Sequence, residues 1–191
     1  MILRNAIEAS RFFLAPALDQ AGCVVDATAG NGHDVLFFCR HTKPDCRIWA
    51  FDIQSAAIQS CERLLEQHGC RGRVRLIHTD HARLAEYVDA PVNAAIFNLG
   101  YLPGQNHAVT TTPGSLAPAL EGLLGLLAPG GRIGIVAYPG HESGRQEITF
   151  LESYLPRCPQ RIYTITRLSF INQINHPAIL YSISKTKEGL L

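Results

Sequence analysis

The stretch VVDATAGNGHD, residues 24–34, joins a short apolar strand to a glycine-rich turn. Its β-branched valines favour the strand, and Gly30 and Gly32 allow the backbone to come close to a bound molecule. Apolar residues resume directly after Asp34, as in a helix that packs on the strand. This order of strand, turn and helix predicts a βα unit with a ligand at its turn.

Strand-like and helix-like segments alternate through the rest of the chain. Apolar, β-branched runs predict strands over 24–27, 47–53, 74–78, 94–99, 132–138, 161–170 and 178–184. Helical patterns begin near Asp34 and cover 55–68, 82–87, 116–127 and 146–154, and Pro129-Gly130-Gly131 marks the end of the helix over 116–127. Continuous apolar strands separated by helices predict a doubly wound, mostly parallel α/β sheet that is covered on both faces.

The last two strands are joined by INQINHP, residues 171–177, which has no helical pattern. A parallel crossover needs a longer connection, so these strands are expected to pair as an antiparallel hairpin at the end of the sheet. With 191 residues, of which 47% are hydrophobic, the chain can bury a substantial core, and we expect one domain over 1–191.

The charge balance is nearly even. Seventeen Lys and Arg oppose sixteen Asp and Glu, so no overall positive field indicates a nucleic-acid partner. The six cysteines lack metal-type spacing, and we expect no metal site. The N-terminal segment lacks the apolar core of a signal peptide, and no run reaches the roughly 18 residues of a membrane span. A cytoplasmic protein without a membrane partner is therefore expected, and the oligomeric state is left open, a homodimer included.

In open α/β sheets a ligand lies beyond the carboxyl ends of the strands, where the strand order reverses. The turn Gly30-Asn31-Gly32 follows the first predicted strand, and Asp52 lies near the end of the second, twenty residues after Gly32. An acidic side chain at that place can accept hydrogen bonds from both hydroxyls of a ribose. Asp80 follows the third strand and can bind an adenine amino group. The spacing therefore predicts a cofactor that contains a nucleoside.

The surroundings of the turn bear on which cofactor this is. A dinucleotide-binding turn has a third glycine where this chain has Val35, which disfavours NAD or FAD. Asp26 and Asp34 flank the turn and suit a cationic amino acid portion, as in S-adenosylmethionine, better than a pyrophosphate. The same residues also have purely structural interpretations. Asp26 can cap a turn, Asp34 can cap the first helix, and a glycine pair can be a simple tight turn.

Asn98 and Tyr101 lie in NLGYLP, at the end of the fourth predicted strand. A nitrogen that accepts a methyl group must point its lone pair along the S–CH₃ bond, and a side-chain amide and a backbone carbonyl can arrange this by accepting its hydrogens. Tyr101 can stack on a base. The structural alternative is that Asn98 caps the strand and Tyr101 packs on the sheet.

Further motifs stand in order with the glycine turn, namely AFDIQ (50–54), FNLGYLPG (97–104), threonines at 110–112, YPGH (138–141) and FINQINHP (170–177). Together with DATAGNGHD (26–34), they resemble the bacterial class I methyltransferases labelled rRNA methylases, over roughly residues 3–185. Members of that family are assigned as tRNA 5-aminomethyl-2-thiouridine methyltransferases, which act at the wobble position of the anticodon.

The resemblance implies a seven-stranded, Rossmann-like sheet, S-adenosylmethionine as methyl donor, and the tRNA anticodon region as partner. The positions that it places on the cofactor side are Gly30, Asn31, Gly32, Asp52, Gln54 and Asp80. To these we add Asp26, Asp34, His81 and Asn98 from their places around the turn and at the strand ends. The positions near the acceptor are Asn98, Tyr101, His141, Asn172 and Asn175, the first three as catalytic groups and Tyr101, Asn172 and Asn175 as substrate-binding groups.

Several points stay open at the sequence level. An alkyl ammonium cannot attack, so the site must favour the free amine, through low polarity or through a base such as His141. His141 equally fits a residue that secures the glycine turn. Gln105-Asn106-His107 and His176-Pro177-Ala178 depart from the family pattern, which has an Asp-Lys pair and two prolines there. Methylation of rRNA or of a small molecule, and an NAD(P)-dependent oxidoreductase, are the alternative functions.

Overall fold

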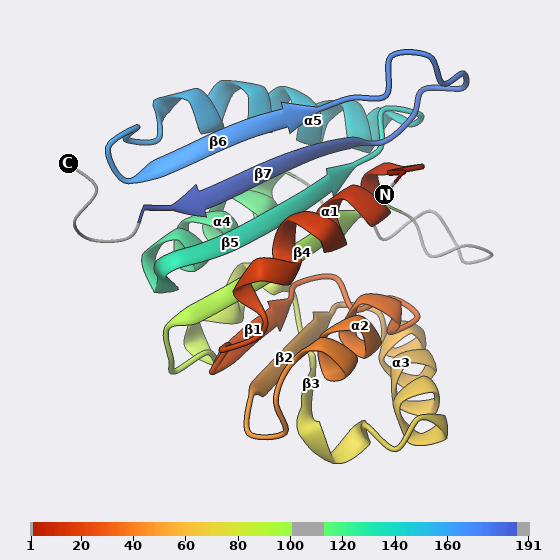
Figure 1. Ribbon diagram of the computed structural model, residues 1–191. Coiled ribbons are helices and arrows are strands. Elements are labelled where there is room, and N and C mark those ends of the chain that lie inside the picture. The colour runs from red at the N-terminus through yellow and green to blue at the C-terminus, as the bar shows by residue number, and fades with distance from the viewer. Residues whose placement is uncertain (1, 101–112, 187–191) are drawn as a thin grey trace.

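The computed structural model describes residues 2–100 and 113–186. Its strands are β1 (Cys23–Asp26), β2 (Arg47–Asp52), β3 (Val74–His78), β4 (Val92–Leu99), β5 (Leu127–Ala137), β6 (Tyr163–Leu168) and β7 (Ile179–Lys185). They form one seven-stranded sheet in the order β3-β2-β1-β4-β5-β7-β6 (Figure 1). β7 runs antiparallel to β5 and β6, and the other neighbours are parallel. The predicted doubly wound sheet with an antiparallel C-terminal hairpin is confirmed.

Helices cover both faces of the sheet (Figure 1). The helices on one face are α1 (Ala6–Leu14), α2 (His33–His41) and α3 (Ser55–Gln67), and those on the other are η3 (His81–Glu86, a 3₁₀ helix), α4 (Pro113–Leu126) and α5 (Glu142–Tyr154). Shorter 3₁₀ helices are η1 (Ala15–Ala17), η2 (Arg71–Arg73) and η4 (Leu155–Arg157). Successive strand residues face opposite sides, so Val24 packs under α2 and α3 while Val25 packs under η3 and α4. This explains why β1 is apolar at consecutive positions.

The predicted start of the fifth strand was wrong. The helix expected over 116–127 ends at Leu126, close to its predicted end, but the strand expected from 132 begins at Leu127 and includes Pro129-Gly130-Gly131. The pairing of β5 with β4 shifts register between Val92 and Ala94, and Gly130 has φ of +76°. A bulge of this kind accommodates extra residues within a strand. Pairing with β4 therefore keeps in the sheet a Pro-Gly-Gly segment whose local sequence favours a turn.

The N-terminal helix α1 lies across β5, β7 and β4. Asn5 caps it, because the Asn5 side chain accepts a hydrogen bond from the Glu8 N–H at 2.8 Å. Small residues on its inner side allow close packing, and the Ser10 Cβ lies 3.4 Å from the position that a Cβ would take at Gly134. No helix among residues 2–100 and 113–186 is long and apolar enough to cross a membrane.

The strand order reverses between β1 and β4. The helix after β1 lies on one face, and the helix that precedes β5 lies on the other, so the connections diverge at this point (Figure 1). The carboxyl ends of β1, β2, β3 and β4 share one edge of the sheet, because these strands are parallel. This edge, called the carboxyl edge below, is where a ligand of such a sheet is expected to lie.

Candidate active site

The glycine turn leaves the end of β1 at the carboxyl edge and is tied to β2. The Ala29 N–H donates to the Phe51 carbonyl at 2.8 Å, and the Gly30 N–H donates to Asp52 Oδ2 at 2.9 Å. Asn31 is held from α3, because the Ser60 hydroxyl donates to Asn31 Oδ1 at 3.0 Å. The turn is therefore shaped by its neighbours on β2 and α3 before any ligand binds.

Asp52 organises the end of β2. Its Oδ2 accepts the Gly30 N–H, and its Oδ1 accepts the Gln54 N–H at 2.9 Å. Burial raises the pKa of Asp52, while these backbone hydrogen bonds act in the opposite direction. A carboxylate offers about four acceptor positions. Two are used by the backbone, which leaves Asp52 with capacity for the hydroxyls of a ribose, as the sequence predicts.

Asp26 is a buried carboxyl group, 1% exposed, at the end of β1. Its Oδ1 accepts the Thr28 N–H at 3.0 Å, so the expected turn-capping contact exists. Its Oδ2 has no hydrogen-bond partner within the described residues. Burial raises the pKa of Asp26 well above its usual range, and the nearby charge of Asp34 adds to this shift. A buried oxygen without a partner fits the cationic amino acid portion of S-adenosylmethionine, which would supply one.

Asp34 does not cap α2. Gly32 occupies the N-cap position, and Asp34 lies in the first turn of the helix. Its carboxylate pairs with Arg11 of α1, whose Nε donates to Oδ1 at 2.8 Å and whose terminal NH2 group lies 2.7 Å from the same oxygen. The pair links the N-terminal helix to the first turn of α2.

Two features of position 32 require a glycine there. Its φ is +86°, and a Cβ there would lie 2.9 Å from Cys61 Sγ and 3.0 Å from Cys61 Cα on α3. We expect Gly32→Ala to lower the free energy of unfolding by about 1–3 kcal/mol, measured by chemical denaturation. Gly69 is the matched control, since its φ is +66° with nothing within 4 Å of the added Cβ. If Gly32→Ala is no more harmful than Gly69→Ala, the close approach of α3 is not a constraint.

Asp80 and His81 follow β3 at the carboxyl edge. Asp80 caps η3, and its Oδ1 accepts the Ala82 N–H at 2.9 Å. His81 is 6% exposed. Its ring stands edge-on to Phe97 with centroids 5.8 Å apart, and its buried Nε2 has no hydrogen-bond partner in the part of the chain described. Burial lowers the pKa of His81. The structure thus brings both residues to the predicted edge, with a structural role for each.

Asn98 lies near the end of β4, between the ends of β1 and β5. Its backbone N–H donates to the Thr28 hydroxyl at 2.7 Å. Its side-chain Oδ1 accepts a hydrogen bond from the Tyr138 hydroxyl at 2.9 Å. The amide is therefore presented at the carboxyl edge, beside the glycine turn.

His141 precedes α5 and caps it. The Gly144 N–H donates to His141 Nδ1 at 2.9 Å, and the Ser143 hydroxyl oxygen is also 2.9 Å from this nitrogen. Asn172 and Asn175 are exposed in the connection between β6 and β7, where Asn175 and His176 have positive φ values of 63° and 54°. Tyr101 and Gln105-Asn106-His107 lie outside the described residues.

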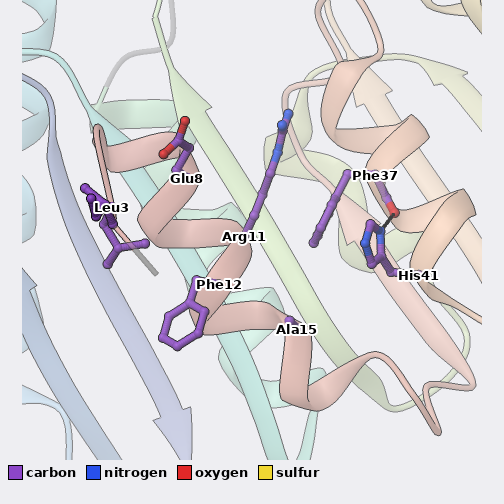
Figure 2. Close-up of a pocket in the computed structure, with 8 residues that line it drawn as sticks. Leu3, Glu8, Arg11, Phe12, Ala15, Phe37 and His41 are labelled. Atoms are coloured by element: carbon purple, nitrogen blue, oxygen red, sulfur yellow. Dashed lines mark hydrogen bonds between the residues drawn. The ribbon is translucent and has the colours of Figure 1, made fainter.

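A groove of about 280 Å³ lies elsewhere, between α1 and α2 (Figure 2). Its lining residues are Ile2, Leu3, Glu8, Arg11, Phe12, Ala15, Phe37 and His41. The Arg11 guanidinium lies 5.5 Å from the centroid of the Phe37 ring, and His41 Nδ1 lies 2.8 Å from the Phe37 carbonyl oxygen. None of the lining residues belongs to the predicted site. We therefore place the candidate active site at the carboxyl edge and not in this groove.

Three residues that contact predicted site residues were missed by the sequence analysis. Arg11 contacts Asp34, Thr28 anchors the Asn98 backbone, and Tyr138 anchors the Asn98 side chain. Thr28 and Tyr138 follow strands that end at the carboxyl edge, so their positions after predicted strands could have identified them. Arg11 offered none, because it comes from a helix that the sequence did not place relative to the sheet.

Comparison with known proteins agrees with this architecture. The family model described as "Putative rRNA methylase" matches residues 48–184. A curated relative, the chloroplastic tRNA (mnm(5)s(2)U34)-methyltransferase of Arabidopsis thaliana, is 31% identical over 192 residues, covering 95% of this chain and 70% of the relative.

Two solved structures are similar over nearly the whole chain. A protein from Clostridium thermocellum described as a "putative rRNA-methylase" has a TM-score of 0.93 and 35% identity, covering 97% of this chain and 100% of that chain. A protein from Streptococcus mutans described as a "putative methyltransferase", solved in complex with SAH, has a TM-score of 0.88 and 35% identity, covering 96% of this chain and 99% of that chain. With the strand order and the carboxyl-edge motifs, these similarities show that the chain belongs to the rRNA methylase family.

Proposed function

We propose that this protein transfers a methyl group from S-adenosylmethionine to the primary amine of 5-aminomethyl-2-thiouridine at the wobble position of tRNA. The chain is a methyltransferase that uses S-adenosylmethionine, as its family and the SAH complex of its Streptococcus mutans relative show. The observation that carries the tRNA substrate is the 31% identity, over 95% of this chain, to a relative named for that nucleoside in tRNA. A tRNA acceptor also fits the cytoplasmic location expected from the sequence, because translation takes place there.

In this proposal the cofactor lies along the ends of β1, β2 and β3. Asp52 would accept hydrogen bonds from the ribose hydroxyls, and the Asp26 carboxyl would face the ammonium group. The other residues proposed to line the cofactor are Gly30, Asn31, Gly32, Asp34, Gln54, Asp80, His81 and Asn98. When bound, S-adenosylmethionine supplies a methyl group that its sulfonium makes electrophilic.

Asn98 is the residue proposed to meet the acceptor amine. Its Oδ1 accepts one hydrogen bond within the protein, and a carbonyl oxygen can accept a second. An N–H of the amine donated there would direct the nitrogen lone pair away from the amide and toward the methyl group. Transfer there would form one C–N bond, break one C–S bond and release one proton from the nitrogen to water. Tyr101, Asn172 and Asn175 stay proposed contacts of the RNA.

The role of His141 can be decided by two substitutions. Because His141 Nδ1 accepts the Gly144 N–H, we expect His141→Ala to cost about 1 kcal/mol of stability through the lost cap. His141→Asn keeps a capping oxygen but removes a base that is active near neutral pH. We expect His141→Asn to retain the thermal midpoint and the pH dependence of kcat. Loss of one limb of that pH profile in the Asn variant would assign His141 as the general base.

The acceptor is tested by comparing three methyl acceptors. Purified protein and labelled S-adenosylmethionine are incubated with tRNA carrying 5-aminomethyl-2-thiouridine, with rRNA, or with the free aminomethyl nucleoside. We expect label only in the tRNA and an affinity for it that falls steeply with salt, because phosphate contacts release counterions. Transfer to rRNA alone would replace the proposed substrate by rRNA. Equal transfer to the free nucleoside, with no salt dependence, would indicate a small-molecule enzyme.

A further inference from the structure

Tyr138 follows β5 directly and reaches the side chain of Asn98 across the neighbouring strand ends. Its hydroxyl donates to Asn98 Oδ1 at 2.9 Å. We propose that Tyr138 is a positioning residue, which fixes the Asn98 amide in the orientation needed for methyl transfer. This inference rests on the proposed function in one respect, namely that Asn98 is the group that meets the acceptor amine.

The strand order explains how Asn98 is held from two sides. β4 lies between β1 and β5, and Asn98 pairs with Val136 of β5. From the β1 side, the Thr28 hydroxyl accepts the Asn98 backbone N–H at 2.7 Å. From the β5 side, the Tyr138 hydroxyl binds the side chain. Backbone and amide are thus each fixed by a separate hydrogen bond from a separate strand end.

The Tyr138 ring is itself fixed by packing. It packs against the cluster of Ala6, Ala9, Val136 and Leu180 under α1. A Cβ at position 100 would lie 3.2 Å from the Cδ2 and Cε2 atoms of the Tyr138 ring, which is tighter than an ordinary van der Waals contact. The glycine in the NLG segment therefore leaves room for this ring, and the ring position sets where the hydroxyl points.

The hydrogen bond holds the Asn98 amide with its oxygen toward Tyr138. An Asn side chain can exchange its oxygen and nitrogen by rotating about the Cβ–Cγ bond, and in this structure it is the oxygen that accepts the hydrogen bond from the Tyr138 hydroxyl. Burial raises the pKa of Tyr138, with the charge of Asp34 adding to the shift, so the hydroxyl keeps its proton at neutral and mildly alkaline pH. The amide oxygen then has one acceptor position filled by Tyr138 and one open toward the amine.

Tyr138→Phe tests the inference, because the variant keeps the ring and removes only the hydroxyl. We expect kcat for methyl transfer to tRNA to fall about tenfold, while the KM for S-adenosylmethionine and the thermal midpoint stay nearly unchanged. The matched control is Tyr163→Phe, which removes a hydroxyl that donates to the Leu124 carbonyl at 3.0 Å. The control should leave kcat unchanged. A general loss of stability, or equal changes in kcat for both variants, would contradict the positioning role.

A double-mutant cycle separates positioning from an independent effect. If Tyr138 acts only through Asn98, Tyr138→Phe should lower kcat in the wild-type background and have no further effect in Asn98→Ala. Additive losses would overturn the inference.

A measurement on the free protein, without substrate, tests the Tyr138–Asn98 contact independently of the proposed function. In ¹H–¹⁵N spectra of the free protein, the Asn98 side-chain NH₂ pair is identified by its absence from Asn98→Ala. Tyr138→Phe should shift or broaden this pair, and Tyr163→Phe should not. An unmoved pair would overturn the proposed contact, whatever the enzyme methylates. A moved pair in a protein that does not methylate the tRNA would retain the contact and reject the proposed substrate.

Discussion

Asn98→Ala is expected to reduce kcat for methyl transfer by about 100-fold or more while the Kd for S-adenosylmethionine stays within about twofold of wild type. The substitution removes the oxygen proposed to orient the amine and leaves the backbone N–H bonded to Thr28. Single-turnover transfer to tRNA gives the rate, and calorimetric titration gives the affinity. A loss of rate without a loss of affinity would place Asn98 on the acceptor side of the cofactor.

Asn93→Ala provides a control on the same strand. Asn93 lies at the opposite end of β4, where its Oδ1 accepts the Gly22 N–H at 2.9 Å and the Cys23 N–H at 3.2 Å. This variant should lose stability, because two backbone groups lose their acceptor, but it should retain kcat. If Asn98→Ala were as active as Asn93→Ala, the amide would have no part in the reaction.

Asp52→Ala is expected to raise the Kd for S-adenosylmethionine by about 100-fold, because charge-assisted hydrogen bonds to two hydroxyls would be lost. The variant also removes the acceptor of the Gly30 and Gln54 N–H groups, so the glycine turn loses the Gly30 bond to β2 and keeps the Ala29 bond to the Phe51 carbonyl. Calorimetric titration of the free protein measures the affinity without any RNA.

Two further variants serve as comparisons for the affinity of Asp52→Ala. Asp52→Asn keeps one acceptor oxygen and should bind the cofactor more tightly than Asp52→Ala. Asp89→Ala removes an exposed carboxylate that pairs with Arg47 at 2.9 Å, and it should leave cofactor affinity unchanged. Wild-type affinity in Asp52→Ala would contradict the assignment of Asp52 to the ribose.

The sequence was informative wherever the signal is local. Continuous apolar runs identified the strands, and the helix-free connection over 171–177 identified the antiparallel hairpin. The start of β5 was predicted incorrectly, because its register shift against β4 depends on the partner strand. The start of α5 was expected at 146 but lies at Glu142, because the His141 side chain supplies the cap there.

The prediction of the site also succeeded for local features and failed for contacts between distant residues. Asp26, Asp52, Asp80 and Asn98 were correctly predicted to lie at one edge, because the carboxyl ends of parallel strands meet there. Their partners were not, since the Arg11–Asp34 and Tyr138–Asn98 contacts join residues distant in sequence. Such pairs follow from how α1 crosses the sheet and from the neighbouring positions of β4 and β5. Neither arrangement can be inferred from a local sequence pattern.

The most direct test is a single-turnover reaction of the wild-type protein with S-adenosylmethionine and tRNA carrying 5-aminomethyl-2-thiouridine. The nucleosides are then digested and identified by mass spectrometry. A matched tRNA with an unmodified wobble uridine serves as the control acceptor. We predict that the aminomethyl nucleoside gains one methyl group on its amine nitrogen and that the control tRNA gains none. Cofactor that binds but transfers no methyl group to this nucleoside would contradict the proposed reaction.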